Sequence, residues 1–186
     1  MREFRLAGGF AQLDALEGRL CLPCNQFARI PLVRLYFSAA SRLGDGIAWY
    51  VTIVALPIVF GMEALPASVH VVATGLVGVA IYKLLKSALV RERPFASHAQ
   101  VEPVTAPLDR YSFPSGHTMH AVSFLVMLGH YFPSIMWIML PFGISVAASR
   151  VILGLHYPSD VLAGALIGWG LASVSLAIWP LTWPLL

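Results

Sequence analysis

The tetrapeptide Pro114-Ser115-Gly116-His117 directly precedes an apolar stretch and can form a helix start that binds anions. Pro114 and Gly116 favour a tight turn, and we expect a helix to begin near His117. The free backbone N–H groups and positive dipole end of a helix attract anions, and the Ser115 hydroxyl adds a donor. An ordinary capped helix start fits the tetrapeptide equally well, so other residues must decide between the two interpretations.

Three basic residues, Lys86, Arg93 and Arg150, lie at the ends of other apolar stretches. Unpaired cations in a pocket of low dielectric constant repel one another, and the neighbouring Glu92 and Asp160 are too few to neutralise them. A phosphate group would supply the missing negative charge, and arginine binds phosphate oxygens bidentately. Three other basic residues fit ordinary snorkelling, in which the charged end of a long side chain stays in water: Lys83, Arg91 and Arg110.

His156 and Asp160 are four residues apart and can act as a nucleophile and the group that orients it. If the turn between them is compact, the carboxylate accepts a hydrogen bond from one ring nitrogen and leaves the other free to attack phosphorus. His117 can protonate the leaving oxygen and later activate water. Two histidines with a phosphate between them complete a hydrolytic cycle without a metal ion. The remaining histidines are expected to form hydrogen bonds between helices: His70, His98, His120 and His130.

The composition predicts an all-α integral membrane protein as the scaffold of these residues. Of the 186 residues, 58% are hydrophobic and only 11% are charged, whereas about a quarter of the residues in a soluble domain are charged. A membrane-spanning helix needs about 20 predominantly apolar residues. Five apolar runs approach or reach this length, so we expect a helical bundle with about five transmembrane helices. These runs cover residues 47–62, 67–89, 117–132, 135–153 and 161–179.

The N-terminal part of the chain has a different pattern. Residues 10–43 mix apolar side chains with arginines and are interrupted by Pro23 and Pro31. This pattern favours two short amphipathic helices that lie in the membrane interface without spanning it. We therefore divide the chain into an N-terminal amphipathic interfacial segment, residues 1–43, and a membrane-embedded core, residues 44–186.

The two polar connections that carry the candidate residues must lie on the same side of the membrane. Residues 90–116 join the second and third apolar runs, and residues 154–160 join the fourth and fifth. Because two helices separate these connections, their polar residues can meet at one end of the bundle. The topology thus predicts a single site that contains both His117 and His156.

Three motifs in this arrangement resemble the signature of the type 2 phosphatidic acid phosphatase family. The motifs K-x6-RP, PSGH and SR-x5-H-x3-D appear in this order and with the right spacing, beginning at Lys86, Pro114 and Ser149. Each motif alone is weak, but the three together are highly specific. The resemblance covers most of the chain, from about residue 43 to residue 179.

The resemblance implies a role for each matched position. His156 would form a phosphohistidine intermediate, Asp160 would orient it, and His117 would be the general acid. Family members that act on lipids typically have six spanning helices, and here the N-terminal segment would replace the first of them. The resemblance implies neither a metal ion nor another cofactor. Phosphate would be held by five residues: Lys86, Arg93, Ser115, Gly116 and Arg150.

We therefore expect a membrane phosphatase that hydrolyses a lipid phosphate or diphosphate. Candidate substrates are undecaprenyl diphosphate, phosphatidylglycerophosphate, phosphatidic acid and the 1-phosphate of lipid A. Tolerance for several headgroups is expected, since little is present to read them beyond Asp109, Arg110 and Tyr111. Nucleic acid is not an expected partner, because the chain has no clustered basic face on a polar domain. The sequence does not determine the oligomeric state.

Other functions fit the same residues less well. Soluble acid phosphatases and vanadium haloperoxidases have a similar signature, but the apolar runs argue against both. An intramembrane serine protease, with Ser115 as nucleophile and His156 as base, leaves the three basic residues unexplained. A carrier that binds phosphate headgroups of lipids without cleaving them would use these cations equally, but it would leave both histidines and Asp160 without a role.

The expected location is the cell inner membrane, as a multi-pass protein, and two arguments about its orientation conflict. All lysines and arginines fall on the active-site side or in the N-terminal segment. The positive-inside rule therefore places the site in the cytoplasm. The family resemblance instead implies a site that faces the periplasm, so both orientations stay open at this point.

Overall fold

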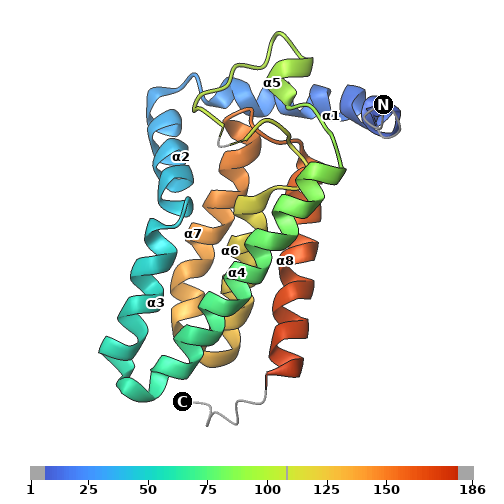
Figure 1. The fold of residues 1–186 in the computed structure, drawn as a ribbon. Coiled ribbons are helices and arrows are strands. Elements are labelled where there is room, and N and C mark those ends of the chain that lie inside the picture. Colours follow the sequence, from blue (N-terminus) through green and yellow to red (C-terminus); the bar gives the residue numbers. More distant parts are fainter. Residues whose placement is uncertain (1–6, 108, 180–186) are drawn as a thin grey trace.

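The computed structural model describes residues 7–107 and 109–179, which form helices and connections with no strand among them (Figure 1). The start of the predicted N-terminal segment, residues 1–6, and the end of the predicted membrane-embedded core, residues 180–186, lie outside the described residues. The prediction of an all-α fold is confirmed. The helices are α1 (Ala7–Phe27), α2 (Pro31–Gly44), α3 (Ile47–Phe60), the 3-10 turn η1 (Met62–Ala64), α4 (Leu65–Ala88), α5 (Pro94–Ser97), α6 (Gly116–Tyr131), α7 (Pro133–Ile152) and α8 (Pro158–Ile178).

Helix α6 is the centre of the bundle and packs against α4, α7 and α8. Helix α2 packs on α7, and α3 packs on α4. Helix α1 lies across one end of the bundle, together with α5 and the long connection that follows it (Figure 1). The C-terminal ends of α4 and α7 and the N-terminal ends of α6 and α8 all reach this end. The predicted site residues are therefore brought to the same end of the molecule.

Within residues 7–107 and 109–179, three helical segments are long and apolar enough to cross a membrane: Met62–Ala88, Pro133–Ile152 and Pro158–Ile178. Helices α2 and α3 meet this condition only together, as a pair bent by 55°. Helix α6 has 16 residues and is shorter than the roughly 20 residues of a full span. The described residues therefore contain three such segments, or four if the bent pair forms one span, which is fewer than the expected number of about five.

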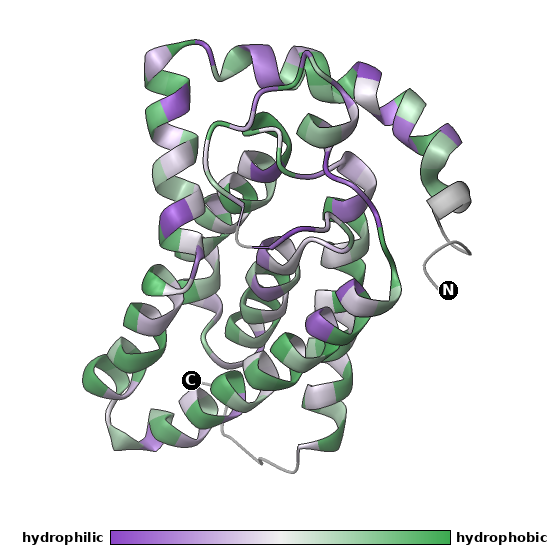
Figure 2. Ribbon diagram, turned by 45° about the horizontal axis from the view of Figure 1, so that its top comes forward, coloured by the Kyte–Doolittle hydropathy of each residue, from purple (hydrophilic) through white to green (hydrophobic). Residues whose placement is uncertain are grey.

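Hydropathy varies along the length of the bundle. Figure 2 shows hydrophobic residues along much of α3, α4 and α8, and many hydrophilic residues near α1 and α5. Large apolar side chains point outward from the bundle, such as Ile58 (78% exposed), Leu166 (61%) and Val174 (60%). Apolar surface on this scale is typical of contact with lipid. The chain is a multi-pass membrane protein.

The N-terminal helices differ from the two short interfacial helices that the sequence suggested. Helix α1 has 21 residues and runs through Pro23 without ending there. The break falls before Pro31, which begins α2 because proline is tolerated in the first turn of a helix. Helix α1 does lie across the bundle end, but α2 packs along α7 and continues into α3. The division of the chain at residue 43 stays a prediction.

Two glycines of α8 let this helix approach α6 closely. A Cβ atom on Gly164 would lie 2.5 Å from the carbonyl oxygen of Ser115, and one on Gly168 would lie 2.2 Å from that of Met119. Small residues commonly allow such close contact between membrane helices. The approach is close enough for the Ser115 N–H to donate a hydrogen bond to the Asp160 carbonyl oxygen over 3.1 Å. These glycines thereby join the starts of α6 and α8.

Candidate active site

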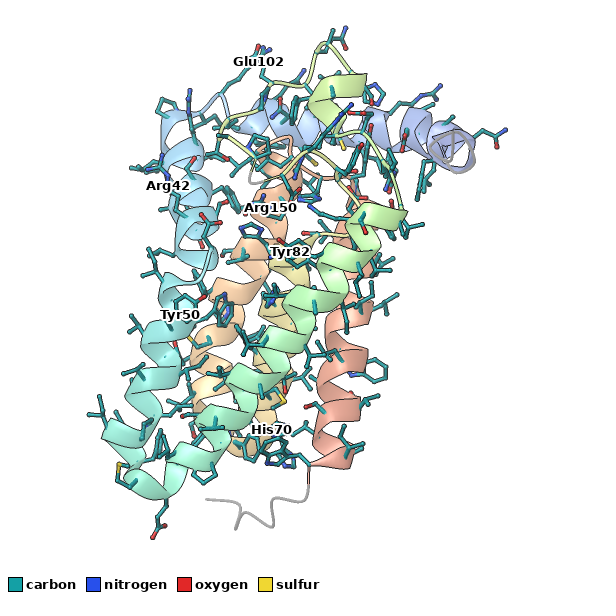
Figure 3. All side chains as sticks on the ribbon, viewed as in Figure 1. Arg42, Tyr50, His70, Tyr82, Glu102 and Arg150 are labelled. Carbon is teal, nitrogen blue, oxygen red and sulfur yellow. The ribbon has the colours of Figure 1, made fainter. Side chains whose placement is uncertain are left out.

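A cavity of about 350 Å³ lies beside the N-terminus of α6. Figure 3 shows two of its lining residues, Arg150 and Tyr82, near the α1 end of the bundle, and His70 near the opposite end. The two histidines predicted to act together both line this one cavity, as the topology predicted: His117 lies in the first turn of α6, and His156 lies in the connection between α7 and α8. Most of the predicted site residues line it: Lys86, Arg93, Gly116, His117, Arg150 and His156.

Ser115 caps the N-terminus of α6, which begins one residue before the predicted position. Its side chain is fully buried. The Ser115 Oγ lies 3.0 Å from the hydroxyl of Thr118 and 3.5 Å from the Thr118 amide nitrogen. Gly116 and His117 line the cavity, whereas Ser115 does not. Its phosphate-binding role stays a prediction, and a nucleophilic role as in a serine protease has no support from this placement.

Asp160 lies behind His156, away from the cavity lining, and is fully buried. Its Oδ2 atom accepts a hydrogen bond from the Tyr157 N–H over 2.8 Å, which helps to cap α8. The same oxygen lies 3.5 Å from Nδ1 of His156. This separation is long for a hydrogen bond, but it places the carboxylate opposite the ring nitrogen that the sequence paired with it.

The His156 ring is buried between this carboxylate and the cations of the cavity. Its Nε2 atom lies 3.4 Å from Nη1 of Arg93. Burial lowers the pKa of His156 well below its ordinary value, and the charges of Arg150 and Arg93 lower it further. The imidazole is therefore neutral near pH 7, which is the form whose free nitrogen can act as a nucleophile.

Asp109 bridges two of the predicted phosphate-binding cations. Its carboxylate pairs with Lys86 and, over 2.8 Å, with Nη2 of Arg93. Burial alone would raise the pKa of Asp109, but hydrogen bonds and charge from Lys86 and Arg93 outweigh it and hold the pKa below its ordinary value. Arg93 also donates to the carbonyl oxygen of Leu155 over 2.7 Å. A carboxylate thus already binds where two cations face the cavity.

Arg150 is the third predicted cation, and its charge is the least compensated. The residue is 3% exposed and lines the cavity. Its Nη1 donates to the Ser41 hydroxyl over 2.5 Å. The Nε donor has no hydrogen-bond partner within the described chain. A buried guanidinium with an unused donor beside a cavity is suited to binding an anion.

His117 pairs with Asp45, a residue that the sequence analysis did not include. The contact joins Nε2 of His117 and Oδ1 of Asp45. Asp45 lies in the short bend between α2 and α3, flanked by Gly44 and Gly46, and all three residues line the cavity. The sequence feature that could have identified Asp45 is an isolated carboxylate between two glycines at the start of an apolar run.

Comparison with known proteins identifies the family to which the chain belongs. A model of the PAP2 superfamily matches residues 67–183. The chain belongs to the PAP2 superfamily. The bacitracin transport permease protein BcrC of Bacillus licheniformis is 36% identical over 88 residues, which cover 46% of this chain and 42% of that protein. Phosphatidylglycerophosphatase B of Escherichia coli K12 is 39% identical over 70 residues, which cover 35% of this chain and 28% of the relative.

A solved structure matches most of the chain. The crystal structure of Aquifex aeolicus LpxE is 28% identical, with a TM-score of 0.72, and the match covers 86% of this chain and 93% of that one. The matches to the two curated relatives, in contrast, span less than half of each relative's length. The family and the fold are therefore established, and the resemblance seen in the three motifs is confirmed.

The PAP2 cavity has an apolar half that extends away from the cations between α3 and α4. Its lining there includes Trp49, Ile53 and Val79. Tyr50 and Leu76 also line it, and they are 67% and 65% exposed. Because these two residues are also exposed on the outer surface of the bundle, the apolar half of the cavity reaches that surface sideways, between α3 and α4. One cavity thus joins a cationic end to an apolar groove.

The structure corrects one expectation about the three basic residues that were predicted to snorkel. Lys83 and Arg110 are exposed, as snorkelling predicted. Arg91 is 1% exposed, so the snorkelling expectation for this residue is wrong. Its guanidinium is instead buried among carboxylates of α1 and α8. The sequence did not reveal this pairing because the partners lie about 70 residues away on either side.

Three of the remaining histidines form the expected contacts between helices, and His98 does so through the Asp14 carbonyl oxygen over 3.2 Å. The expectation is wrong for His130, which is exposed and forms no such hydrogen bond within the described residues. His70 bridges helices by contacting the Tyr131 and Ser175 hydroxyls, each over 2.8 Å. His120 also joins two helices through the Gly75 carbonyl oxygen, over 3.3 Å, and in addition it lines the cavity. Across residues 7–107 and 109–179, no group of three or more His, Cys, Asp or Glu side chains is arranged to hold a metal ion.

Proposed function

We propose that this protein is a membrane phosphatase that hydrolyses a lipid phosphate or diphosphate through a phosphohistidine on His156. The observation that carries this proposal is the two-part cavity. Its polar end brings three cations and two imidazoles together, and its apolar half has room for part of a lipid chain. A lipid phosphate has both chemical characters in one molecule.

In the first step, Nε2 of His156 attacks phosphorus and the bond to the leaving oxygen breaks. His117 gives its proton to that oxygen, so the lipid leaves as an alcohol or, from a diphosphate, as a monophosphate. In the second step, His117 takes a proton from water, which attacks the phosphohistidine. Inorganic phosphate then leaves and His156 is restored.

The residues around the phosphoryl group stabilise the charge that develops in both steps. Lys86, Arg93 and Arg150 surround the position of the phosphoryl oxygens, and the α6 N-terminus at Gly116 adds backbone donors. Asp160 faces Nδ1 of the nucleophilic ring and favours the tautomer in which Nε2 is free. Asp109 must give up its contacts with Lys86 and Arg93 when substrate phosphate binds.

Release of inorganic phosphate from a detergent-solubilised lipid phosphate tests this proposal. The His156→Ala variant should lose at least about a thousandfold in rate, as is typical when a nucleophile is removed. His130→Ala, at the exposed far end of α6, is the matched control and should stay active. Rapid quenching of the wild type with labelled substrate should trap an acid-labile phosphoprotein. Full activity of His156→Ala would contradict the assignment of the nucleophile.

The cavity supports tolerance among the four candidate lipids. Of the loop residues expected to read a headgroup, Asp109 is held by Lys86 and Arg93, and Arg110 points away from the protein with 76% side-chain exposure. Rates should therefore be compared for undecaprenyl diphosphate, phosphatidylglycerophosphate, phosphatidic acid and lipid A 1-phosphate. A preference above about a thousandfold for one lipid, or some 4 kcal/mol, would refute this tolerance.

A lipid carrier is the competing function, and the name of the Bacillus licheniformis relative refers to transport. A carrier would use the same cations and the same apolar groove. Tight binding of a lipid phosphate by the wild-type protein, with no phosphate released, would favour the carrier. The His117–Asp45 and His156–Asp160 pairs favour the hydrolase, because binding alone requires neither pair.

We further propose that the protein resides in the inner membrane, with the orientation to be decided by labelling. In a background without Cys21 and Cys24, Ala99→Cys marks the active-site end and Glu63→Cys marks the other end; both positions are exposed. A membrane-impermeant thiol reagent applied to intact spheroplasts should label only one of the two. Labelling of Ala99→Cys supports the periplasmic orientation, and labelling of Glu63→Cys supports the cytoplasmic one.

A further inference from the structure

The guanidinium of Arg91 is completely buried and links three segments of the chain. Its Nε donates to Asp14 over 2.9 Å, and its Nη2 donates to Glu17 over 2.7 Å, both on α1. Its Nη1 donates to Oδ1 of Asp160 over 2.6 Å and to the Ser159 hydroxyl over 2.7 Å. Arg91 therefore uses all three of its nitrogens to join α1 to the first turn of α8.

The guanidinium of Arg91 provides the positive charge that compensates the carboxylates around it. Three carboxylates, from Asp14, Glu17 and Asp160, contact Arg91. Burial by itself would lower the pKa of Arg91, but these carboxylates outweigh it and raise the pKa above its ordinary value. Without the guanidinium, Asp160 would be buried near two like charges, a situation that favours protonation of a carboxylate.

Glu17 holds the same turn of α8 by a second route. Its Oε1 accepts a hydrogen bond from the Ser159 N–H over 2.8 Å, and its Oε2 accepts one from the Ser159 hydroxyl over 2.6 Å. A carboxylate is favourable at a helix N-terminus because it complements the positive end of the dipole. Glu17 therefore fixes the residue that directly precedes Asp160.

The two oxygens of Asp160 are thus held from opposite directions. Oδ1 contacts Arg91, and Oδ2 accepts from the Tyr157 N–H over 2.8 Å while facing His156. The Tyr157 ring in turn lies 4.2 Å from the guanidinium carbon of Arg91. A displacement of Arg91 would move the carboxylate relative to the His156 ring. Catalysis is sensitive to displacements of about 1 Å, which can cost about a hundredfold in rate.

We propose that Arg91 and Glu17 are positioning residues for the reaction, so that α1 sets the geometry of the Asp160–His156 pair. This inference rests on the proposed function, since it assumes that Asp160 orients a nucleophilic His156. Neither residue lines the cavity, and both act through Asp160 and the α8 turn. Helix α1 therefore covers the end of the bundle and also helps to position Asp160 for the reaction.

Two conservative variants of the full-length protein test the proposal. Arg91→Lys keeps the charge but cannot contact α1 and α8 through three nitrogens, and Glu17→Gln keeps the shape but loses the charge. The exposed residues Arg29 and Glu92, which do not line the cavity, supply matched controls, Arg29→Lys and Glu92→Gln. Each variant is measured for kcat and KM on a lipid phosphate, for inhibition by inorganic phosphate, and for thermal unfolding in detergent.

We expect kcat to fall about tenfold or more in Arg91→Lys and in Glu17→Gln, with both controls near wild type. The inhibition constant of inorganic phosphate should stay within about threefold, since the cations that bind it are untouched. A merely structural role would instead leave kcat per folded molecule unchanged. If Arg91→Lys fails to fold, Glu17→Gln decides by the same criteria.

The outcome separates this inference from the proposed function. Normal kcat in Glu17→Gln and in folded Arg91→Lys, together with an inactive His156→Ala, would overturn the positioning role and leave the nucleophile assigned. An active His156→Ala would overturn the proposed function itself. A parallel loss of kcat and of phosphate binding in both test variants would also overturn the positioning role, because it would indicate a general distortion of the site.

Discussion

Replacing Gly164 by alanine should separate the starts of α6 and α8 and thereby disturb the candidate site. The added Cβ atom would lie 2.5 Å from the Ser115 carbonyl oxygen. Ordinary van der Waals contact begins at 3.4 Å, so the two backbones must separate by roughly 1 Å, and overpacking of this kind typically costs about 1–3 kcal/mol. The hydrogen bond from Ser115 to Asp160, now 3.1 Å, would lengthen as well.

A shift of this size also predicts a loss of activity. The moved elements carry His117 on one side and the His156–Asp160 turn on the other, and a misplacement of about 1 Å can lower a rate about a hundredfold. Thermal unfolding in detergent and phosphate release from a lipid phosphate measure the two effects separately. Both the unfolding temperature and kcat should fall in Gly164→Ala.

The same helix provides the control for this experiment. Gly170 has no heavy atom within 4 Å of an added Cβ, so Gly170→Ala changes the sequence without forcing the helices apart. This variant should keep its activity and gain up to about 1 kcal/mol from the higher helix propensity of alanine. Equal stability and activity in Gly164→Ala and Gly170→Ala would refute the view that close backbone contact builds the site.

Three further predictions concern the charges of the site. Asp109→Asn removes the carboxylate that pairs with Lys86 and Arg93, so inorganic phosphate should inhibit about tenfold more strongly; weaker inhibition would contradict this. Asp45→Asn removes the partner of His117 and should lower kcat about tenfold, with little change in KM. His156 has a lowered pKa, so the unfolded chain takes up a proton below about pH 6.5 that the folded chain does not. Melting temperature should therefore fall between pH 7 and pH 5, and it should fall less in His156→Asn; equal losses would count against a buried neutral ring.

The placement of most candidate residues around one cavity was predictable from sequence because their spacing and the topology work together. The count of helices between residues 90–116 and 154–160 placed His117 and His156 on one side, and both now line one cavity. The motif spacing placed Asp160 beside His156, and the structure brings these side chains within 3.5 Å. Proximity between residues of one motif follows from their spacing. Proximity between motifs that are separated by whole membrane spans follows from the topology, so neither prediction requires knowledge of how the helices pack.

Relations that depend on packing were not predictable. Arg91 is a long basic residue beside an apolar run, which fits snorkelling equally well. Only the position of α1 shows that two of its partners are Asp14 and Glu17. Asp45 could be recognised as a partner of His117 only once the bend between α2 and α3 was placed against α6. Helix α2 was assigned to the interface because amphipathic character does not reveal whether water, lipid or a neighbouring helix such as α7 covers each face.

The sideways opening between α3 and α4 has a consequence for the kinetics of this protein. Under the proposed function, a substrate that enters there from the membrane would never leave the bilayer, and its dephosphorylated product would return the same way, while only inorganic phosphate would escape to water. Encounters are then governed by the mole fraction of substrate in the membrane plane. Adding inert lipid or detergent at constant total substrate should slow turnover by surface dilution, even though the bulk concentration is unchanged.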